Sequence, residues 1–358
     1  MENYKKIFYL NGFLTINLKM ESHFFVLKIF ILWFLSLSIS LFAEQGRGES
    51  QEKIGYIPWF TGPLLSPSAV VQPPGRVFEQ VYLFDAWVTR SYNGNGSTRS
   101  VPLFRTWSVL CQTVIGIFDR IDIQLIPKWD RNSSHGHVSL HIEDLPVGFD
   151  FQIVKTNNDA WYPSVKLGIY EVLPTGKYQK LKPNKLGTDS TGAGSYRTQA
   201  NLVFQKLIRV YDNHYLRGRF SLIYTYFHPT HIKGINTFGG AKDTKGKVSP
   251  GHTFSSILGV ECTLTQNWVL SCECIYDHFN RTAFHGHSGF SAPGVRAIVG
   301  APSKENLSFT PSIEYNVSAR LGFILGSWFS TNGRNTPKFD SIVLSFLYIY
   351  PNAFENRF

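Results

Sequence analysis

The chain has 358 residues and a formal net charge of +10, and 43% of its residues are hydrophobic whereas only 17% are charged. This length suffices for one large barrel or for two ordinary domains. Aromatic residues make up 15% of the chain, but a long apolar run, the mark of a membrane-spanning helix, occurs only once.

That run covers residues 24–43 and has three features of a signal peptide. Lys28 shortens its apolar core, serines fill its second half, and Ala43 stands before a polar run as a cleavage residue would. We therefore predict that residues 1–43 form a signal peptide with its true start at Met20; the alternative is a membrane anchor. For an exported basic chain, the expected partners are anionic lipid head groups or anionic solutes rather than nucleic acid.

A proline-rich stretch follows over residues 44–76. Repeated proline excludes a helix and a central strand of a sheet. We interpret the stretch as a periplasmic arm or as a plug of a lumen, with a plain linker as the alternative. Four large apolar residues indicate that it packs on something, and these candidate plug residues are Trp59, Phe60, Leu64 and Leu65.

Strict alternation marks residues 307–329. The apolar set begins with Leu307, Phe309 and continues at every second position, while serine, threonine and Glu314 occupy the positions between. Side chains on a strand alternate between its two sides, so this segment has one apolar face and one polar face. Two such strands of about ten residues, joined by almost nothing, predict a transmembrane β-hairpin.

Alternating segments of this kind recur along the rest of the chain. They cover residues 77–90, 103–118, 121–130, 147–154, 161–173, 196–210, 214–227, 253–264, 268–279, 306–317, 319–330 and 339–350. A soluble sandwich also alternates, so this pattern alone leaves two fold classes open. We predict an all-β fold, a closed antiparallel transmembrane β-barrel of about 12 strands over residues 77–358.

The connections favour the transmembrane barrel over the sandwich. Long connections (91–102, 131–146, 174–195, 228–252 and 280–305) alternate with short ones (119–120, 155–160, 211–213, 265–267 and 318–319), and a moderate one follows at 331–338. Outer-membrane barrels have short periplasmic turns and long external loops. The tryptophans agree with two interfacial girdles, since Trp87, Trp107, Trp129 and Trp328 stand near predicted outer strand ends and Trp161 and Trp268 near inner ones.

The faces opposite the apolar rows define the candidate pore-lining residues. They are Asp122, Gln124, Lys128, Asp150, Arg197, Arg217, Arg219, Glu261, Glu273 and Glu314. The arginines stand on neighbouring strands, so one wall segment is predicted to be basic and the rest mainly acidic. A transverse field across an open pore would follow, which favours polar or charged solutes. The alternative is that these charges pair across the lumen and fill it.

Other chemistry finds little support in the sequence. Cys262 and Cys272 could form a cross-strand disulfide, but the cysteines lack the spacing of metal ligands. His-Gly-His occurs at 135–137 and at 285–287, without carboxylates at fixed spacing. A barrel enzyme would need a nucleophile beside a base, and the candidates Ser271, Ser308 and His278 stand alone. We therefore predict no metal, no cofactor and no catalytic residues.

Three short motifs carry a resemblance to a known family. Residues 59–68 read WFTGPLLSPS, residues 143–145 read EDL, and residues 173–178 read LPTGKY. The chain resembles the outer-membrane β-barrels named for the meta-pathway of phenol degradation. Glu143 stands where that family usually has glycine, and Pro351 interrupts the pattern before the terminal Phe358. The resemblance implies a porin-like channel or transporter. It also implies apolar or aromatic solutes as the transported molecules.

The sequence therefore predicts a channel in a Gram-negative outer membrane for passive uptake of small solutes. Its expected partners are the lipid bilayer, lipopolysaccharide, the solute and the outer-membrane assembly machinery. A non-conducting surface barrel whose loops bind a partner is the alternative, and a barrel enzyme is a more distant one.

Overall fold

The structure is a computed structural model, and it describes residues 58–156, 160–211 and 213–350. The predicted signal peptide, the first part of the arm at 44–57 and the C-terminal segment 351–358 lie outside the described residues. Among the described residues, no helix has the length and apolar character needed to cross a membrane.

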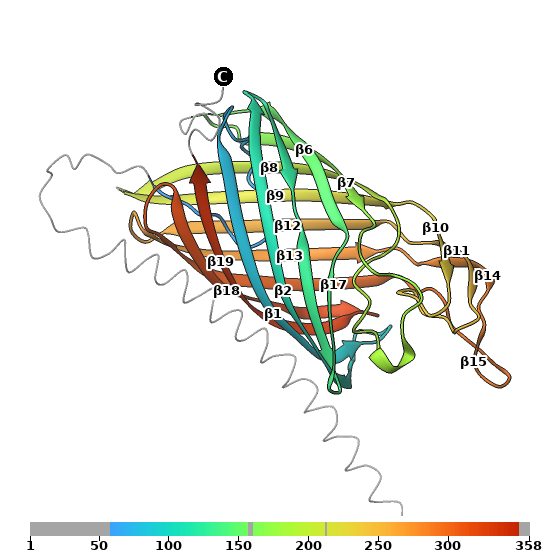
Figure 1. Cartoon of the computed structure of the whole chain (residues 1–358). Coiled ribbons are helices and arrows are strands. Elements are labelled where there is room, and N and C mark those ends of the chain that lie inside the picture. Colours follow the sequence, from blue (N-terminus) through green and yellow to red (C-terminus); the bar gives the residue numbers. More distant parts are fainter. Residues whose placement is uncertain (1–57, 157–159, 212, 351–358) are drawn as a thin grey trace, which may run out of the picture. The chain divides into compact units, whose positions relative to one another are not determined.

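Most of the described chain forms one closed antiparallel barrel with 12 wall strands (Figure 1). The strands are β1 (Val77–Tyr92), β2 (Thr98–Phe118), β3 (Ile121–Leu125) continued by β4 (Lys128–Ser134), β5 (His137–Ile142) continued by β6 (Leu145–Val154), β7 (Ser164–Leu173), β8 (Arg197–Tyr211), β9 (His214–Phe227), β12 (Thr253–Thr263), β13 (Trp268–Phe279), β17 (Lys304–Asn316), β18 (Leu321–Arg334) and β19 (Pro337–Tyr350). The barrel closes because β1 pairs with β2 on one side and with β19 on the other. The predicted fold class is confirmed.

The two faces of the wall follow the alternation of the sequence. On β17, the inward side chains of Ser308, Thr310 and Glu314 are each 0% exposed, whereas the outward Tyr315 is 39% exposed. On β18, the inward Ile324 is 0% exposed and its outward neighbour Leu325 is 53% exposed. The polar face therefore lies inside the barrel and the apolar face lies outside it.

The predicted strict alternation of long and short connections is wrong. β1 and β2 continue to a short turn at 93–97, and β4 and β5 continue to a turn at His135 and Gly136, whose φ angles of 47° and 77° suit a two-residue hairpin. Likewise, β18 and β19 meet at Asn335, which has a φ of 54°. These strands stay hydrogen-bonded up to their turns. The signal for this in the sequence is weak on β4, which has no apolar residue after Trp129, whereas Val138, Leu140 and Ile142 of β5 do alternate with polar residues.

Three connections are long, at 174–196, 228–252 and 280–303, and all lie at one end of the barrel, called here the long-loop end. They contain the 3₁₀ turn η1 (Pro183–Lys185) and the hairpin of β15 (Phe290–Ala292) with β16 (Val295–Arg296). They also contain a three-stranded sheet of β10 (Thr230–Lys233), β11 (Lys245–Ser249) and β14 (Ala283–His287), beyond the wall strands in Figure 1. The sequence predicts loops for all these segments.

Candidate functional site: the barrel lumen and the arm that lines it

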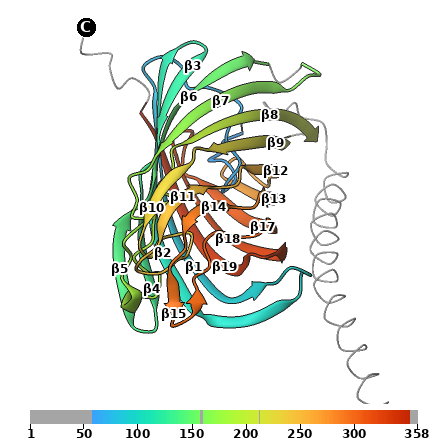
Figure 2. The same cartoon turned by 90° about the vertical axis from the view of Figure 1, so that its right-hand side faces the viewer.

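The arm, residues 58–76, lies inside the barrel, where carboxylates of the wall accept hydrogen bonds from its backbone (Figure 2). Glu314 Oε2 accepts the N–H groups of Thr61 and Gly62 at 2.9 and 3.2 Å. Glu273 accepts those of Leu65 and Ser66 at 2.9 and 2.5 Å. A proline-rich, extended segment has no regular hydrogen-bond ladder of its own, so wall side chains must satisfy most of its buried N–H groups.

The same pattern continues along the arm toward β2. Three further wall side chains accept a backbone N–H group, namely Gln205 from Ala69 (3.4 Å), Gln152 from Val71 (2.9 Å) and Asp122 from Gln72 (2.8 Å). These acceptors stand on β8, β6 and β3, so the contacts proceed from strand to strand around the inside of the wall. The arm therefore runs along the inner wall, and its backbone is held at five positions.

An apolar anchor fixes the arm on the neighbouring part of the wall, beyond β17. Leu64 is 2% exposed and packs with the inward-facing Tyr82, Ile324 and Val343 of β1, β18 and β19. Trp328 packs against this cluster, and its Nε1–H donates to Ser308 Oγ at 3.0 Å. Trp328 thus faces the lumen, and its predicted place in an outer girdle is wrong.

Glycines provide the space for the arm at two close approaches. A Cβ atom at Gly322 would overlap Thr61 Oγ1, and one at Gly116 would overlap the carbonyl oxygen of Pro73. Neither glycine has a left-handed φ, so the arm, not the local backbone, requires the missing side chain. The arm is therefore fitted to this wall by shape as well as by hydrogen bonds.

The predicted basic and acidic wall segments neutralise each other locally. Arg217 lies directly opposite Glu261 on the neighbouring strand and donates to it through Nε at 2.6 Å. Arg219 Nε lies 3.4 Å from the same carboxylate, and its Nη1 donates to Ser66 O at 2.8 Å. The Arg217 guanidinium also stands 3.9 Å from the ring centroid of Phe60. These charges pair with neighbours along the wall and with the arm. Neither predicted arrangement is found: the charges neither stay apart on opposed walls of the pore nor pair across the lumen.

A second polar cluster surrounds Asp150, which is 0% exposed. Its carboxylate accepts from Lys166 Nζ at 2.5 Å, from Tyr170 Oη at 2.6 Å and from the Gln124 amide. Lys166 and Tyr170 were not among the sequence candidates. Their spacing of four on a predicted strand places both on one face, and that periodicity was the available signal.

The remaining candidates, Lys128 and Arg197, lie where the wall meets the loop at 174–196. Lys128 Nζ lies 3.0 Å from Glu143 Oε1, and Arg197 Nη2 lies 3.0 Å from Asp144 Oδ2. Here two of the family-like motifs make contact, because Gly176 N–H donates to Asp144 at 2.9 Å. Both candidates therefore pair with two neighbouring acidic residues of the wall, of which Asp144 accepts hydrogen bonds from the loop.

Trp59, the last of the four predicted plug residues, is half-buried and lies inside the barrel with the rest of the arm.

The enzyme candidates do not converge, since Ser271 is hydrogen-bonded to Ser312, and His278 to Asn280 at 3.1 Å. Within the described ranges, no three metal-ligating side chains cluster. All four cysteines are free, and the register places Cys262 opposite Leu270, so the conceivable Cys262–Cys272 disulfide is not formed.

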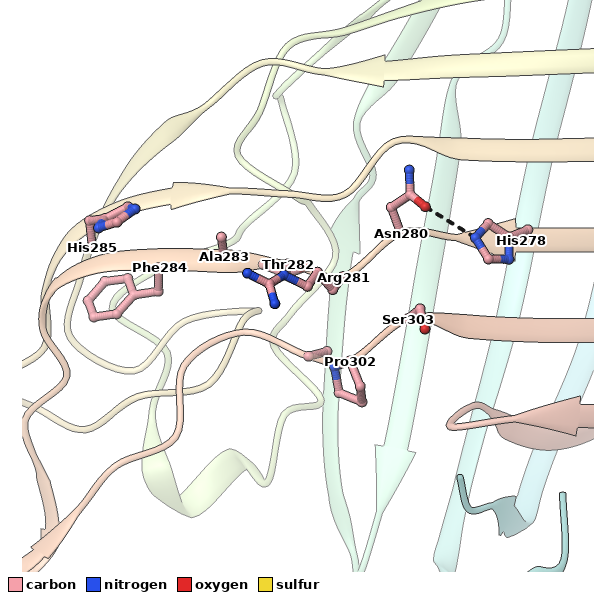
Figure 3. Close-up of a pocket in the computed structure, with 10 residues that line it drawn as sticks. His278, Asn280, Arg281, Thr282, Ala283, Phe284, His285, Pro302 and Ser303 are labelled. Atoms are coloured by element: carbon pink, nitrogen blue, oxygen red, sulfur yellow. Dashed lines mark hydrogen bonds between the residues drawn. The ribbon is translucent and has the colours of Figure 1, made fainter. Parts of the chain in front are cut away.

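An open depression of about 830 Å³ lies outside the lumen, where the chain leaves β13 (Figure 3). Cationic and apolar side chains line it together, among them Arg281, Phe284, His285 and Pro302. It lies beside the three-stranded sheet of the long-loop end, since Phe284 and His285 belong to β14.

The comparison with solved structures shows the fold. An outer-membrane channel from Pseudomonas putida F1 matches over 80% of this chain and 100% of that chain, with a TM-score of 0.62 and 12% sequence identity. Two autotransporter barrels match less well. The transport unit of AIDA-I from Escherichia coli matches over 76% of this chain and 89% of that chain, with a TM-score of 0.42 and 9% identity. The translocator domain of NalP from Neisseria meningitidis matches over 76% of this chain and 87% of that chain, with a TM-score of 0.40 and 11% identity, and at these scores neither match carries an argument for this chain.

No protein-family model matches the sequence, and the search of curated proteins gives no match either. The class that fold and comparison define is thus a closed antiparallel β-barrel with the fold of the Pseudomonas channel.

Proposed function

We propose that this protein is an outer-membrane channel through which small solutes pass passively. One observation carries the proposal: a closed barrel has its polar residues inside and its apolar residues outside, with an arm held along the inner wall. In a bilayer, a closed barrel satisfies every backbone group of its wall, and a polar interior suits a water-filled path.

The outer surface supports the membrane location. Large apolar side chains face outward on every side of the wall, with exposed fractions of 43% for Ile123, 48% for Phe149, 54% for Leu258, 53% for Leu325 and 42% for Leu344. A soluble protein rarely exposes so continuous an apolar surface. We place the long-loop end outside the cell and the opposite end, which has the turns at 119–120, 264–267 and 317–320, in the periplasm, as in other outer-membrane barrels.

The arm is proposed to line the channel and to set its width. Its contacts follow the wall from β17 to β2, so it narrows the lumen along the wall. The polar inner wall favours small polar solutes, and the resemblance to the phenol meta-pathway barrels adds small aromatic ones. We propose membership of that family as well, supported by the contact between the motifs at Asp144 and Gly176.

Proteoliposome swelling with solutes of graded size tests this function. Liposomes that contain the folded protein should swell with small sugars and small aromatic alcohols, at rates that fall steeply as solute size increases. Liposomes that contain the heat-denatured protein give the background rate. A swelling rate equal to that background for every solute would contradict a channel and favour a surface barrel that does not conduct.

A further inference from the structure

The three-stranded sheet at the long-loop end carries a two-row array of basic side chains on its exposed face. In one row, His231, Lys247 and His285 lie side by side on β10, β11 and β14. In the other row, Lys233, Lys245 and His287 do the same, two residues further along each strand. All six side chains are exposed, and they are called here the basic face.

The opposite face of this sheet is buried, which fixes the orientation of the basic face. Ile232 and Val248 alternate with the basic residues and are each 0% exposed. The sheet is also tied to the neighbouring loop, because Lys180 N–H donates to Lys233 O at 3.3 Å. The basic face therefore points away from the molecule. Figure 2 shows the sheet at the end of the barrel that faces the viewer.

The array works against the stability of its own sheet. Lys233 and Lys245 lie directly opposite each other, and like charges at such positions are destabilising. Lysines on edge strands commonly prevent unwanted strand pairing, but Lys245 and Lys247 stand on the central strand β11. Protection of a sheet edge thus explains Lys233 and leaves the central pair unexplained.

Among the described residues, one acidic residue contacts the basic face, and it does so at His287. Asp243, which precedes β11, lies 3.2 Å from His287 Nε2, and this hydrogen bond lowers the pKa of the Asp243 carboxyl. The alternating positions of β10, β11 and β14 that form the basic face carry no Asp or Glu. The three lysines are therefore a concentrated, uncompensated positive charge.

We propose that the basic face binds a linear anionic polysaccharide, a chain of sugars that bears sulfate or carboxylate groups. This proposal rests on the orientation given under the proposed function, with the long-loop end outside the cell. Neighbouring strands lie about 4.8 Å apart and alternate residues of one strand about 6.8 Å apart, so the lysine and histidine side chains form a flat lattice, and its three lysines suit closely spaced anionic groups.

The chemistry of the surface favours a polysaccharide over a nucleic acid. All six residues of the basic face are lysine or histidine, and the face has no arginine, the residue that forms two-pronged bonds to phosphate. The proposed orientation also places the basic face outside the cell, which favours a polysaccharide over a nucleic acid.

Heparin chromatography of the detergent-purified full chain tests the proposal, with heparin as the probe. The triple variant Lys233→Ser, Lys245→Ser, Lys247→Ser should bind heparin roughly 10- to 100-fold more weakly than the native chain, as expected for the loss of three exposed ion pairs. A control variant, Arg90→Ser, Arg99→Ser, Arg131→Ser, removes the same charge from other positions outside the basic face and should retain heparin affinity. Swelling rates of the triple variant should remain native, which separates this proposal from the channel.

Three results would overturn the proposal. The first is native heparin affinity in the triple lysine variant, and the second is an equal loss in the control variant, which would make net charge the cause. The third is competition by single-stranded DNA of equal charge at the same concentration as heparin, which would assign the surface to nucleic acid.

Discussion

At five inward positions a wall side chain accepts a backbone N–H group of the arm, and the acceptors are Asp122, Gln152, Gln205, Glu273 and Glu314. The sequence placed the three acidic members on the inner wall by alternation alone. It did not reveal what they bind, because the arm has no periodicity that could be aligned with the wall. Gln152 and Gln205 were not among the candidates, although both stand at inward positions of predicted strands.

Removal of one such acceptor should loosen the arm locally. Glu273→Ala leaves the N–H groups of Leu65 and Ser66 without their charged acceptor, which should cost about 1.5–3 kcal/mol, or roughly 10- to 150-fold faster amide exchange at residues 64–67. Hydrogen exchange read by mass spectrometry measures this. Glu305→Ala is the control, since Glu305 pairs with Arg334 away from the arm. Native exchange in Glu273→Ala would refute the role of this carboxylate.

A side chain at Gly322 should displace the arm by shape alone. Gly322→Val places atoms where Thr61 Oγ1 lies, whereas Gly218→Val meets nothing within 4 Å of its Cβ atom. Overpacking of this kind costs about 1–3 kcal/mol if nothing moves, so the arm should shift instead. Limited proteolysis should cut residues 58–66 readily in Gly322→Val and slowly in Gly218→Val. Equal cleavage in both variants would show that the arm does not depend on this glycine.

At the scale of the element, the wall strands were the most predictable part of the fold. The segments predicted at 214–227 and 268–279 coincide with β9 and β13. Alternation is strong there because each strand separates an apolar outside from a polar inside. The β4–β5 hairpin was predicted as a long loop because β4 has no apolar residue after Trp129, although Val138, Leu140 and Ile142 of β5 do alternate with polar residues. The small sheet of β10, β11 and β14 was missed because its strands are too short to show a clear alternation.

Depth along the outer face should decide how well a charge is tolerated. Leu258→Arg near the middle of β12 should cost about 2–4 kcal/mol and lower the yield of assembled barrel, whereas Val317→Arg, at a turn, should cost about 0–1 kcal/mol. The two native side chains are comparably exposed, at 54% and 47%, so depth is the variable. Heat-modifiable migration in gels measures assembly. Equal yields would contradict the membrane-facing assignment of β12.

At the scale of the whole molecule, the sequence predicted the barrel fold but not the pairing of charges and arm inside the lumen. A pore with opposed basic and acidic walls was predicted from inward charges, but the register brings Arg217 against Glu261 on adjacent strands. Strand alternation gives the side of each residue, whereas neighbour relations depend on register, which sequence alone does not supply. The arm adds a further set of partners from a distant part of the chain.

The orientation of the barrel can be tested on intact cells. An epitope tag at Lys242, in the long connection 228–252, should be reached by antibody, whereas a tag at Gln266, in the short turn 264–267, should not. Both tags should become accessible after the cells are lysed, which controls for expression. Labelling of Gln266 on intact cells would reverse the proposed topology.

Single-channel conductance in planar bilayers tests the central claim most directly. The native chain should produce discrete conductance steps, because a polar lumen lined by the arm admits ions. A variant that lacks residues 58–74 should produce larger steps, since the arm occupies part of the lumen along the wall. The absence of steps from both proteins, with the barrels shown to be folded, would contradict a channel. Steps of equal size would contradict an arm that sets the width.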